Sequence, residues 1–213
     1  IAGLGFEKLV YGGLTKVFAG IVIAPIGGLI VGVLLTGLII TVFANRKPAP
    51  VNKIFGRLQI ISSAWFALTH GANDGQKTMG IIALILFSAG MIPELDIPLW
   101  VIFAAAAAMG LGTFFGGYKV IKTLGVKITR LKPYQGFAAE TGGGIMLAAF
   151  AVLGIPASTT HAITGTIMGS GAARRKRAVR WNVSRQIVFS WIITIPGAAG
   201  MGIGFTYLIH LFV

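Results

Sequence analysis

Long apolar segments alternate with short basic segments along the chain. The apolar runs cover residues 16–44, 54–91, 99–117 and 187–213, and an interrupted apolar region covers residues 134–171. About 20 apolar residues are enough for a helix to cross the hydrocarbon core of a bilayer. The pattern therefore predicts an all-α integral membrane protein, a polytopic helix bundle that forms a single membrane domain over residues 1–213. Residues 1–14 form a short leading segment without the cleavage site of a secretory signal.

Composition supports a membrane protein. Hydrophobic residues make up 55% of the chain and charged residues 11%, whereas soluble domains carry about 25% charged residues. The chain has no cysteine, which excludes disulfides and thiolate metal sites. Its net charge of +13 would suggest nucleic acid binding in a soluble protein. Here, however, most Lys and Arg residues fall in clusters between the apolar runs, and we expect no nucleic acid partner. The clusters lie within residues 46–57, 119–132 and 174–185.

The positions of the basic clusters predict a topology. Cytoplasmic loops are enriched in Lys and Arg, so all three clusters are expected on the cytoplasmic side of the cell membrane (plasma or inner membrane). The connection at residues 93–98 has no basic residue and is expected outside. Residues 174–177 can also contact anionic headgroups of membrane lipid. Small residues fill the run at 99–117, which predicts a helix packed tightly among others.

The region at residues 134–171 predicts a re-entrant helical hairpin. Basic clusters flank it on both sides, so both of its ends are expected on the cytoplasmic side. Two apolar arms surround a polar tip at residues 154–161, and neither arm has 20 strictly apolar residues. Irregular backbone at membrane depth is tolerated where protein buries it or where it lines a cavity.

A polar stretch at residues 69–78 interrupts the second apolar run near its middle. The run is either one tilted helix or two half-helices that break near Gly71 or Gly75. We take a discontinuous helix as the expected form, because broken helices hold ions at mid-membrane depth in many transporters. Ionisable side chains inside the bilayer are costly and mark a transport site by default.

The side chains of this stretch suit an alkali cation. In a helix, Asn73, Asp74 and Lys77 share one face with His70. Asn73, Asp74 and Gln76 supply the oxygen ligands that a hard cation such as sodium prefers. The alternative is a structural pair between Asp74 and Lys77 that joins two helices.

Glu140 is the second of the five acidic residues to fall within an apolar region. A buried carboxylate keeps its charge only beside a cation, a basic group or several hydrogen-bond donors. We therefore predict Glu140 as a sodium ligand or proton site, and the alternative is that it pairs a hairpin arm with another helix.

The hairpin tip suits an anion. Ser158, Thr159 and Thr160 follow Pro156 and precede a helical run. Their hydroxyl and N–H donors would lie at a helix N-terminus, where partial positive charge favours an anion such as phosphate. Lys77 is a further candidate for phosphate binding, unless it pairs with Asp74. Alternatively, Ser158 or Thr159 is an N-cap and His161 is a packed residue.

Two motifs in this order resemble the inorganic phosphate transporter (PiT) family. They are Gly71-Ala72-Asn73-Asp74 and Pro156-Ala157-Ser158-Thr159-Thr160-His161. The resemblance implies symport of inorganic phosphate with sodium, or with protons, through an alternating-access cycle. It implies no enzyme activity and no cofactor besides the coupling ion. It also implies that Asn73, Asp74 and Gln76 belong to the cation site and that Ser158, Thr159 and Thr160 bind phosphate.

The family is built from two inverted repeats, each with both motifs, whereas this chain has one copy of each. The chain therefore resembles the C-terminal half of such a transporter. Its start at Ile1, without an initiator Met, agrees with a fragment. The N-terminal half is then part of the same longer chain, a separate polypeptide, or a second copy of this chain in a homodimer.

Two other functions fit parts of the pattern. An intramembrane hydrolase would use Ser158 as nucleophile, His161 as base and Asp74 as orienting group. Thr159 and Thr160 have no role in that scheme. A membrane scaffold subunit that transports nothing is the third interpretation.

Overall fold

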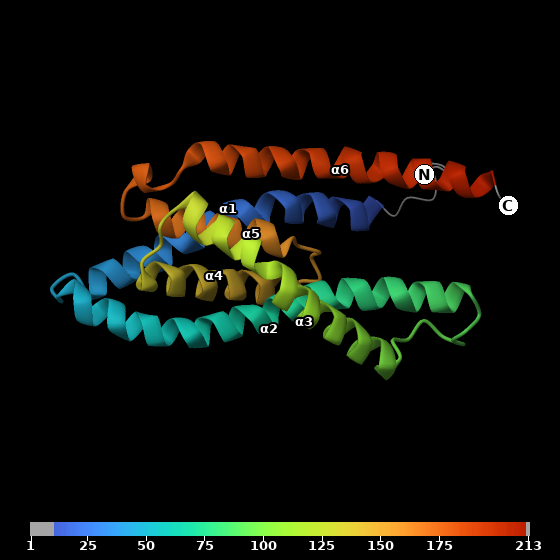
Figure 1. Cartoon of the computed structure of the whole chain (residues 1–213), viewed down its shortest axis with the longest axis horizontal. Coiled ribbons are helices and arrows are strands. Elements are labelled where there is room, and N and C mark those ends of the chain that lie inside the picture. Colours follow the sequence, from blue (N-terminus) through green and yellow to red (C-terminus); the bar gives the residue numbers. More distant parts are fainter. Residues whose placement is uncertain (1–10, 212–213) are drawn as a thin grey trace.

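A computed structural model describes residues 11–211 of the chain, apart from the side chains of residues 119–121, 176 and 210. Every regular element in this part is helical, which confirms the all-α prediction (Figure 1). In order, the elements are α1 (Tyr11–Val42), α2 (Pro48–Ser88), α3 (Leu99–Lys122), the π-helix η2 (Thr123–Ile128), α4 (Pro133–Val152), α5 (Thr159–Ala172), the 3-10 helix η3 (Lys176–Ala178) and α6 (Trp181–His210). Of the predicted leading segment, residues 1–10 lie outside the described residues, and residues 11–14 already belong to α1.

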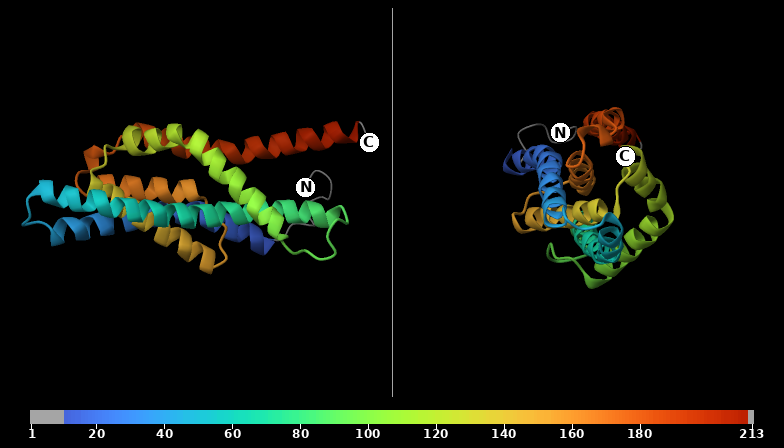
Figure 2. Two further views of the ribbon diagram at one scale, coloured as in Figure 1. Left: turned by 60° about the horizontal axis from the view of Figure 1, so that its bottom comes forward. Right: turned by 90° about the vertical axis from the view of Figure 1, so that its left-hand side faces the viewer.

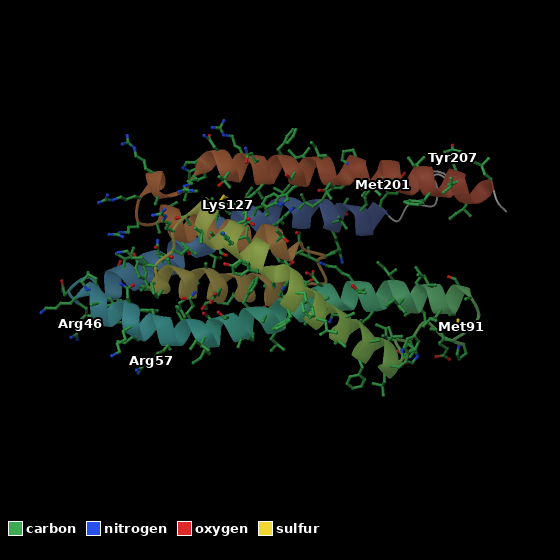
Figure 3. The ribbon with its side chains drawn as sticks, viewed as in Figure 1. Arg46, Arg57, Met91, Lys127, Met201 and Tyr207 are labelled. Carbon is green, nitrogen blue, oxygen red and sulfur yellow. The ribbon has the colours of Figure 1, made fainter. Side chains whose placement is uncertain are left out.

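The molecule is an elongated bundle, and its connections lie at its two ends, apart from the tip between α4 and α5. The connections that hold the three basic clusters all lie at the same end, and the connection between α2 and α3 lies at the other (Figure 1). In Figure 3, Arg46, Arg57 and Lys127 lie toward the first end, and Met91 and Tyr207 toward the second. One end is therefore strongly basic, as the predicted cytoplasmic side requires.

Small residues let α1 and α5 pack with their backbones in direct contact. The buried residues of α1 recur at every fourth position; they are Gly20, Ala24, Gly28, Gly32 and Thr36. A Cβ atom at Gly28 would lie 2.6 Å from the carbonyl oxygen of Ala162 in α5. On the opposite helix, a Cβ atom at Gly169 would overlap the carbonyl oxygen of Leu29. This is the close approach that small residues permit between membrane helices.

The α4–α5 hairpin lies between α1 and α2. Helix α5 packs mainly on α1, and α4 packs mainly on α2. Gly143 and Gly144 leave room on α4 for the rings of Phe66 and Trp65 of α2. The hairpin tip ends about midway along the long helices, and both of its outer ends lie at the basic end (Figure 2). The two-helix hairpin thus matches the sequence prediction, while its re-entrant placement in a bilayer remains a prediction.

The expected discontinuity in the second apolar run is not found. Helix α2 is continuous from Pro48 to Ser88 and passes through Gly71 and Gly75 without a break. No proline interrupts residues 51–92. The polar side chains in this part of α2 contact one another and the hairpin. The backbone keeps its helical conformation throughout this stretch, and the single-helix alternative is correct.

Helices α3 and α6 lie at the outside of the bundle. Only Val101 and Ala105 of α3 are buried among its described side chains, so this chain by itself does not provide the tight packing predicted for this helix. By length and apolar composition, α1, α6 and the helical segment Leu99–Ile128 could each cross a membrane. Helix α2 is longer, but the polar stretch at residues 69–78 lowers its mean hydropathy.

Candidate functional site between α2 and the hairpin tip

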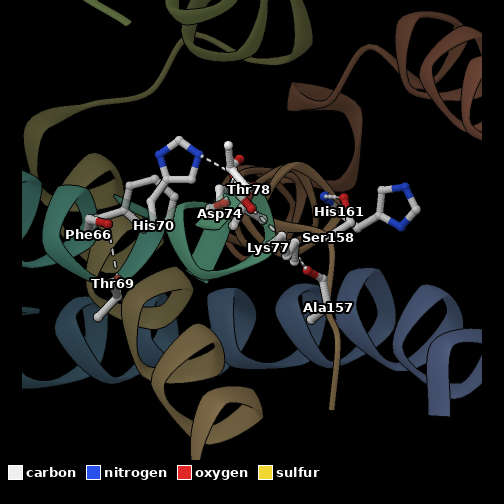
Figure 4. A network of polar contacts seen from close by, with 10 residues as sticks. Phe66, Thr69, His70, Asp74, Lys77, Thr78, Ala157, Ser158 and His161 are labelled. Carbon is white, nitrogen blue, oxygen red and sulfur yellow. Dashed lines mark hydrogen bonds and ion pairs between the residues drawn. The ribbon is translucent and has the colours of Figure 1, made fainter. Parts of the chain in front are cut away.

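Asp74 is the centre of a polar cluster on α2. Its Oδ2 atom lies 3.0 Å from His70 Nε2, and its Oδ1 atom lies 3.1 Å from Lys77 Nζ (Figure 4). Residues three and four positions apart lie on one face of a helix, so the local helix geometry brings these groups together. The phenyl ring of Phe66 stacks on His70, with ring centroids 5.7 Å apart. The structural pair between Asp74 and Lys77 is therefore present.

The hairpin tip joins the same cluster. Thr159 donates a hydrogen bond from Oγ1 to Asp74 Oδ2 over 2.9 Å. Lys77 donates from Nζ to the carbonyl oxygen of Ala157 over 2.7 Å. The two motifs that the sequence analysis selected are thus in direct contact, although about 80 residues separate them.

The first turn of α5 has a capped N-terminus. Ser158 is the N-cap residue, and its Oγ atom accepts a hydrogen bond from the backbone N–H of His161 at 3.4 Å. Thr159 is buried, and Thr160 is exposed. The positive end of the α5 dipole faces the region of Asp74, because Thr159 is the first residue of the helix.

The cluster combines a carboxylate, an ammonium group and hydroxyl donors, and it is partly shielded from solvent. The side chains of Asp74 and Lys77 are 32% and 43% exposed, so one side of the cluster is open in the described chain. A carboxylate that already accepts several hydrogen bonds stays ionised and can exchange one partner for a cation. The hydroxyl and ammonium donors that leave the carboxylate can then donate hydrogen bonds to an anion.

Two of the predicted cation ligands flank Asp74 without joining its contacts. Asn73 is half-buried and Gln76 is exposed. Within the described residues, neither side-chain amide forms a hydrogen bond. Their oxygens therefore remain available beside Asp74.

Glu140 does not lie with Asp74. On α4, it accepts a hydrogen bond from Ser62 Oγ at 2.6 Å and another from Gln59 Nε2 at 3.3 Å. Ser62 precedes Asp74 by about three turns of α2, or roughly 18 Å along the helix axis. The four predicted sodium ligands therefore do not form one group, and Glu140 belongs to a second polar cluster between α2 and α4.

Some groups of these clusters were not selected from the sequence. Main-chain groups such as the Ala157 carbonyl carry no signal in a sequence. Gln59 and Ser62 do carry one, because they are polar residues three positions apart within an apolar run. That spacing places them on one helix face, opposite a carboxylate that needs donors.

The imidazole of His161 is packed away from Asp74. It contacts the indole of Trp191 in α6, with ring centroids 3.8 Å apart, and its Nδ1 atom is buried without a hydrogen-bond partner among the described residues. Figure 4 shows the ring directed away from the Asp74 carboxylate. Ser158, for its part, contacts the backbone of His161. These contacts agree with the structural alternative for His161.

Comparison with known proteins identifies the family. A sequence model of the phosphate transporter family matches residues 1–202. The chain belongs to this family. The resemblance inferred from the two motifs is therefore confirmed, and with it the expectation of a multi-pass protein of the cell membrane.

Individual relatives agree with this assignment. A probable low-affinity inorganic phosphate transporter of Rhizobium meliloti is 48% identical over 200 residues, which are 93% of this chain and 60% of the relative. A protein of the same description from Bacillus subtilis is 39% identical over 95% of this chain and 61% of its own length. The chain thus spans about three fifths of the length of these relatives. They are described as transporters, in agreement with the prediction of a non-enzymatic protein.

A solved structure shows the same fold. The sodium-dependent phosphate transporter superposes with a TM-score of 0.83 over 100% of this chain and 70% of its own. Its sequence is 23% identical, so this similarity concerns the fold.

Proposed function

We propose that this chain forms one half of a secondary transporter that couples the movement of inorganic phosphate to sodium. The hydrogen bond between Thr159 and Asp74 carries this proposal. It places a carboxylate suited to a cation in contact with a helix N-terminus suited to an anion. Secondary transporters commonly build their sites from such elements near the bilayer midplane.

Phosphate would bind at the hairpin tip. Ser158, Thr159 and Thr160 offer hydroxyl donors at the first turn of α5, and Lys77 offers an ammonium group beside them. Thr159 and Lys77 now donate to Asp74, so phosphate would take donors from the carboxylate. The Asp74 carboxylate would then lose the Thr159 hydroxyl donor and its ammonium partner Lys77.

Sodium at the Asp74 carboxylate would replace the donors that phosphate takes from it. An anion next to the Asp74 carboxylate is repelled strongly at low dielectric, and a cation at the carboxylate removes the repulsion. The amide oxygens of Asn73 and Gln76 lie on the same part of α2 and would complete its coordination. Phosphate then binds well only when sodium binds, which is the basis of coupling. A proton on Asp74 is the alternative coupling ion; the sodium dependence of the transporter with the same fold supports sodium.

Glu140 would form a separate sodium position closer to the basic end. Its carboxylate lies between α2 and α4 with the oxygen atoms of Ser62 and Gln59 nearby. A cation leaving Asp74 toward that end would meet this carboxylate next. Pairing of the two helices is its alternative role.

The open side of the Asp74 cluster would face the partner half. The relatives extend well beyond this chain, and Gln76, Lys77 and Thr78 of α2 are exposed in it. We infer that the partner half covers this side and adds a second set of ligands. Alternating access would then be a movement between the two halves around the shared site.

The contacts do not favour the hydrolase. Its serine would have to donate to an imidazole that an acidic residue orients. Ser158 instead accepts from the main chain of His161, and the imidazole that contacts Asp74 belongs to His70.

Phosphate uptake into proteoliposomes that contain both halves tests the proposal. We expect an inward sodium gradient to drive uptake, and an equal potassium gradient not to. Asp74→Asn keeps the size of the side chain and removes its charge, and we expect it to lower sodium-driven uptake about tenfold or more. Asp96→Asn is the matched control, because within the described part of the chain Asp96 accepts a hydrogen bond only from the adjacent Ile97 N–H. Full sodium-driven uptake in Asp74→Asn would refute the role of Asp74, and uptake driven only by a proton gradient would refute sodium coupling.

A further inference from the structure

A cavity lies at the basic end of the bundle, far from Asp74. It has a volume of about 230 Å³ and opens where the end of α1, the start of α2 and both outer ends of the hairpin meet. Asn52 of α2 lines it and precedes Asp74 by about six turns, or roughly 33 Å. The cavity is therefore distinct from the proposed transport site. Its volume suits a small ligand such as a lipid headgroup. Pockets that bind drug-sized molecules usually exceed about 300 Å³.

Three cationic side chains from three different connections line this cavity. They are Arg46, which precedes α2, Lys132, which precedes α4, and Arg174, which follows α5. No lining residue is acidic. Among the described residues, the ion pairs formed by Lys, Arg or His all involve Asp74, so these three cations have no carboxylate partner. Like charges around one cavity repel each other, and a bound anion would remove that repulsion.

Polar groups in the cavity wall define the anion further. Helices α2 and α4 both begin at this wall, with Pro48 and Pro133 in their first turns, and their positive ends favour phosphate. The side-chain oxygen of Asn52 is buried and has no hydrogen-bond partner among the described residues. A buried acceptor without a partner is costly, so a ligand that also carries a hydroxyl group would satisfy it.

We propose that this cavity binds a phosphate group that carries a hydroxyl substituent, as in the phosphoglycerol headgroup of an anionic lipid. Inorganic hydrogen phosphate has the same chemistry. The lipid is the better match, because Ile39, Ile40 and Phe43 form an apolar part of the wall beside the cations. A phospholipid would place its acyl chains along that part and its headgroup against Arg46 and Arg174.

Binding of short-chain lipids to the purified transporter with both halves present, in neutral detergent, tests this site. We expect dioctanoyl phosphatidylglycerol to raise the unfolding temperature in a saturable manner, and dioctanoyl phosphatidylcholine to have little effect. Arg174→Gln should weaken binding about tenfold, the loss of one charged hydrogen bond. Arg175→Gln is the matched control, because it removes the same charge from the adjacent exposed residue, which does not line the cavity.

Equal weakening in Arg174→Gln and Arg175→Gln would show diffuse attraction to a basic surface and would overturn the site. A temperature shift with inorganic phosphate, abolished by Arg174→Gln and absent with phosphatidylglycerol, would assign the cavity to free phosphate. A phosphate response that Arg174→Gln leaves intact comes from elsewhere and counts against the cavity. If Arg174→Gln lowers the unfolding temperature without ligand, Asn52→Asp replaces it, because a carboxylate of the same size in the wall would repel the anion.

Discussion

Thr159 donates a hydrogen bond to Asp74 across 85 positions of the sequence, with 2.9 Å between Oγ1 and Oδ2. This bond ties the first turn of α5 to the middle of α2. Lys77 makes a second link to the same tip through the carbonyl of Ala157. The Asp74 carboxylate is therefore one of the groups that hold the hairpin tip against α2. A ligand that changes the partners of this carboxylate would release or move the tip.

Removal of the Thr159 hydroxyl should weaken both the fold and the site. Thr159→Val keeps the shape of the side chain but leaves Asp74 Oδ2 without this donor at a buried position. We expect a loss of about 1–3 kcal/mol in the free energy of unfolding, measured in detergent, and a raised KM for phosphate in uptake assays. Thr159→Ser should restore most of both. Normal stability and normal KM in Thr159→Val would show that the hydroxyl contributes to neither.

Ser158 allows capping and phosphate binding to be separated. Ser158→Ala removes the acceptor for the His161 N–H and should cost about 1 kcal/mol of stability. Ser158→Asn and Ser158→Asp both keep a capping oxygen and should retain stability. They should differ in uptake, because only the aspartate places a negative charge where phosphate would bind.

Uptake by the two variants that keep a capping oxygen shows whether phosphate contacts residue 158. If Ser158→Asp and Ser158→Asn support the same phosphate uptake, phosphate does not approach this residue and Ser158 acts as a helix cap alone.

Much of the architecture was predictable from the sequence, because it follows from periodicity and charge. The apolar runs gave the helices, and the basic clusters gave the common end to which their connections belong. The choice of residues 69–78 and 156–161 as the two polar segments of the site was also predictable. Its signal is chemical, because a carboxylate and a row of hydroxyl groups in apolar surroundings need partners.

Other structural features depend on tertiary packing and leave no clear pattern in the sequence. Glycine alone does not reveal whether a helix breaks, and Gly71 and Gly75 lie within the continuous helix α2. Small residues in α3 and in α1 look alike in the sequence, but only those of α1 face another helix closely. Glu140 was grouped with Asp74 because both are acidic and intramembrane, whereas its donors lie about three turns earlier on α2.

The contact between α1 and α5 should be sensitive to a single methyl group. In Gly28→Ala the new Cβ would lie 2.6 Å from the carbonyl oxygen of Ala162, so the two backbones must separate. We expect a destabilisation of about 1–3 kcal/mol in equilibrium unfolding in detergent. Gly37→Ala on the same helix is the control, because nothing lies within 4 Å of its Cβ position. It should be neutral or stabilising by up to about 1 kcal/mol. Equal effects of the two substitutions would contradict the close packing of α1 on α5.

Glu140→Gln should distinguish a second sodium position from a link between helices. The amide keeps an oxygen that can accept from Ser62, and Gln59 can turn its own amide to pair with it. Stability should therefore stay within about 1 kcal/mol of the original protein. Sodium loses a charged ligand, however, so the sodium concentration for half-maximal uptake should rise severalfold, while the KM for phosphate at saturating sodium stays unchanged. Glu94→Gln, in the connection between α2 and α3, controls for the change in net charge. An unaltered sodium dependence in Glu140→Gln would mean that Glu140 only joins α4 to α2.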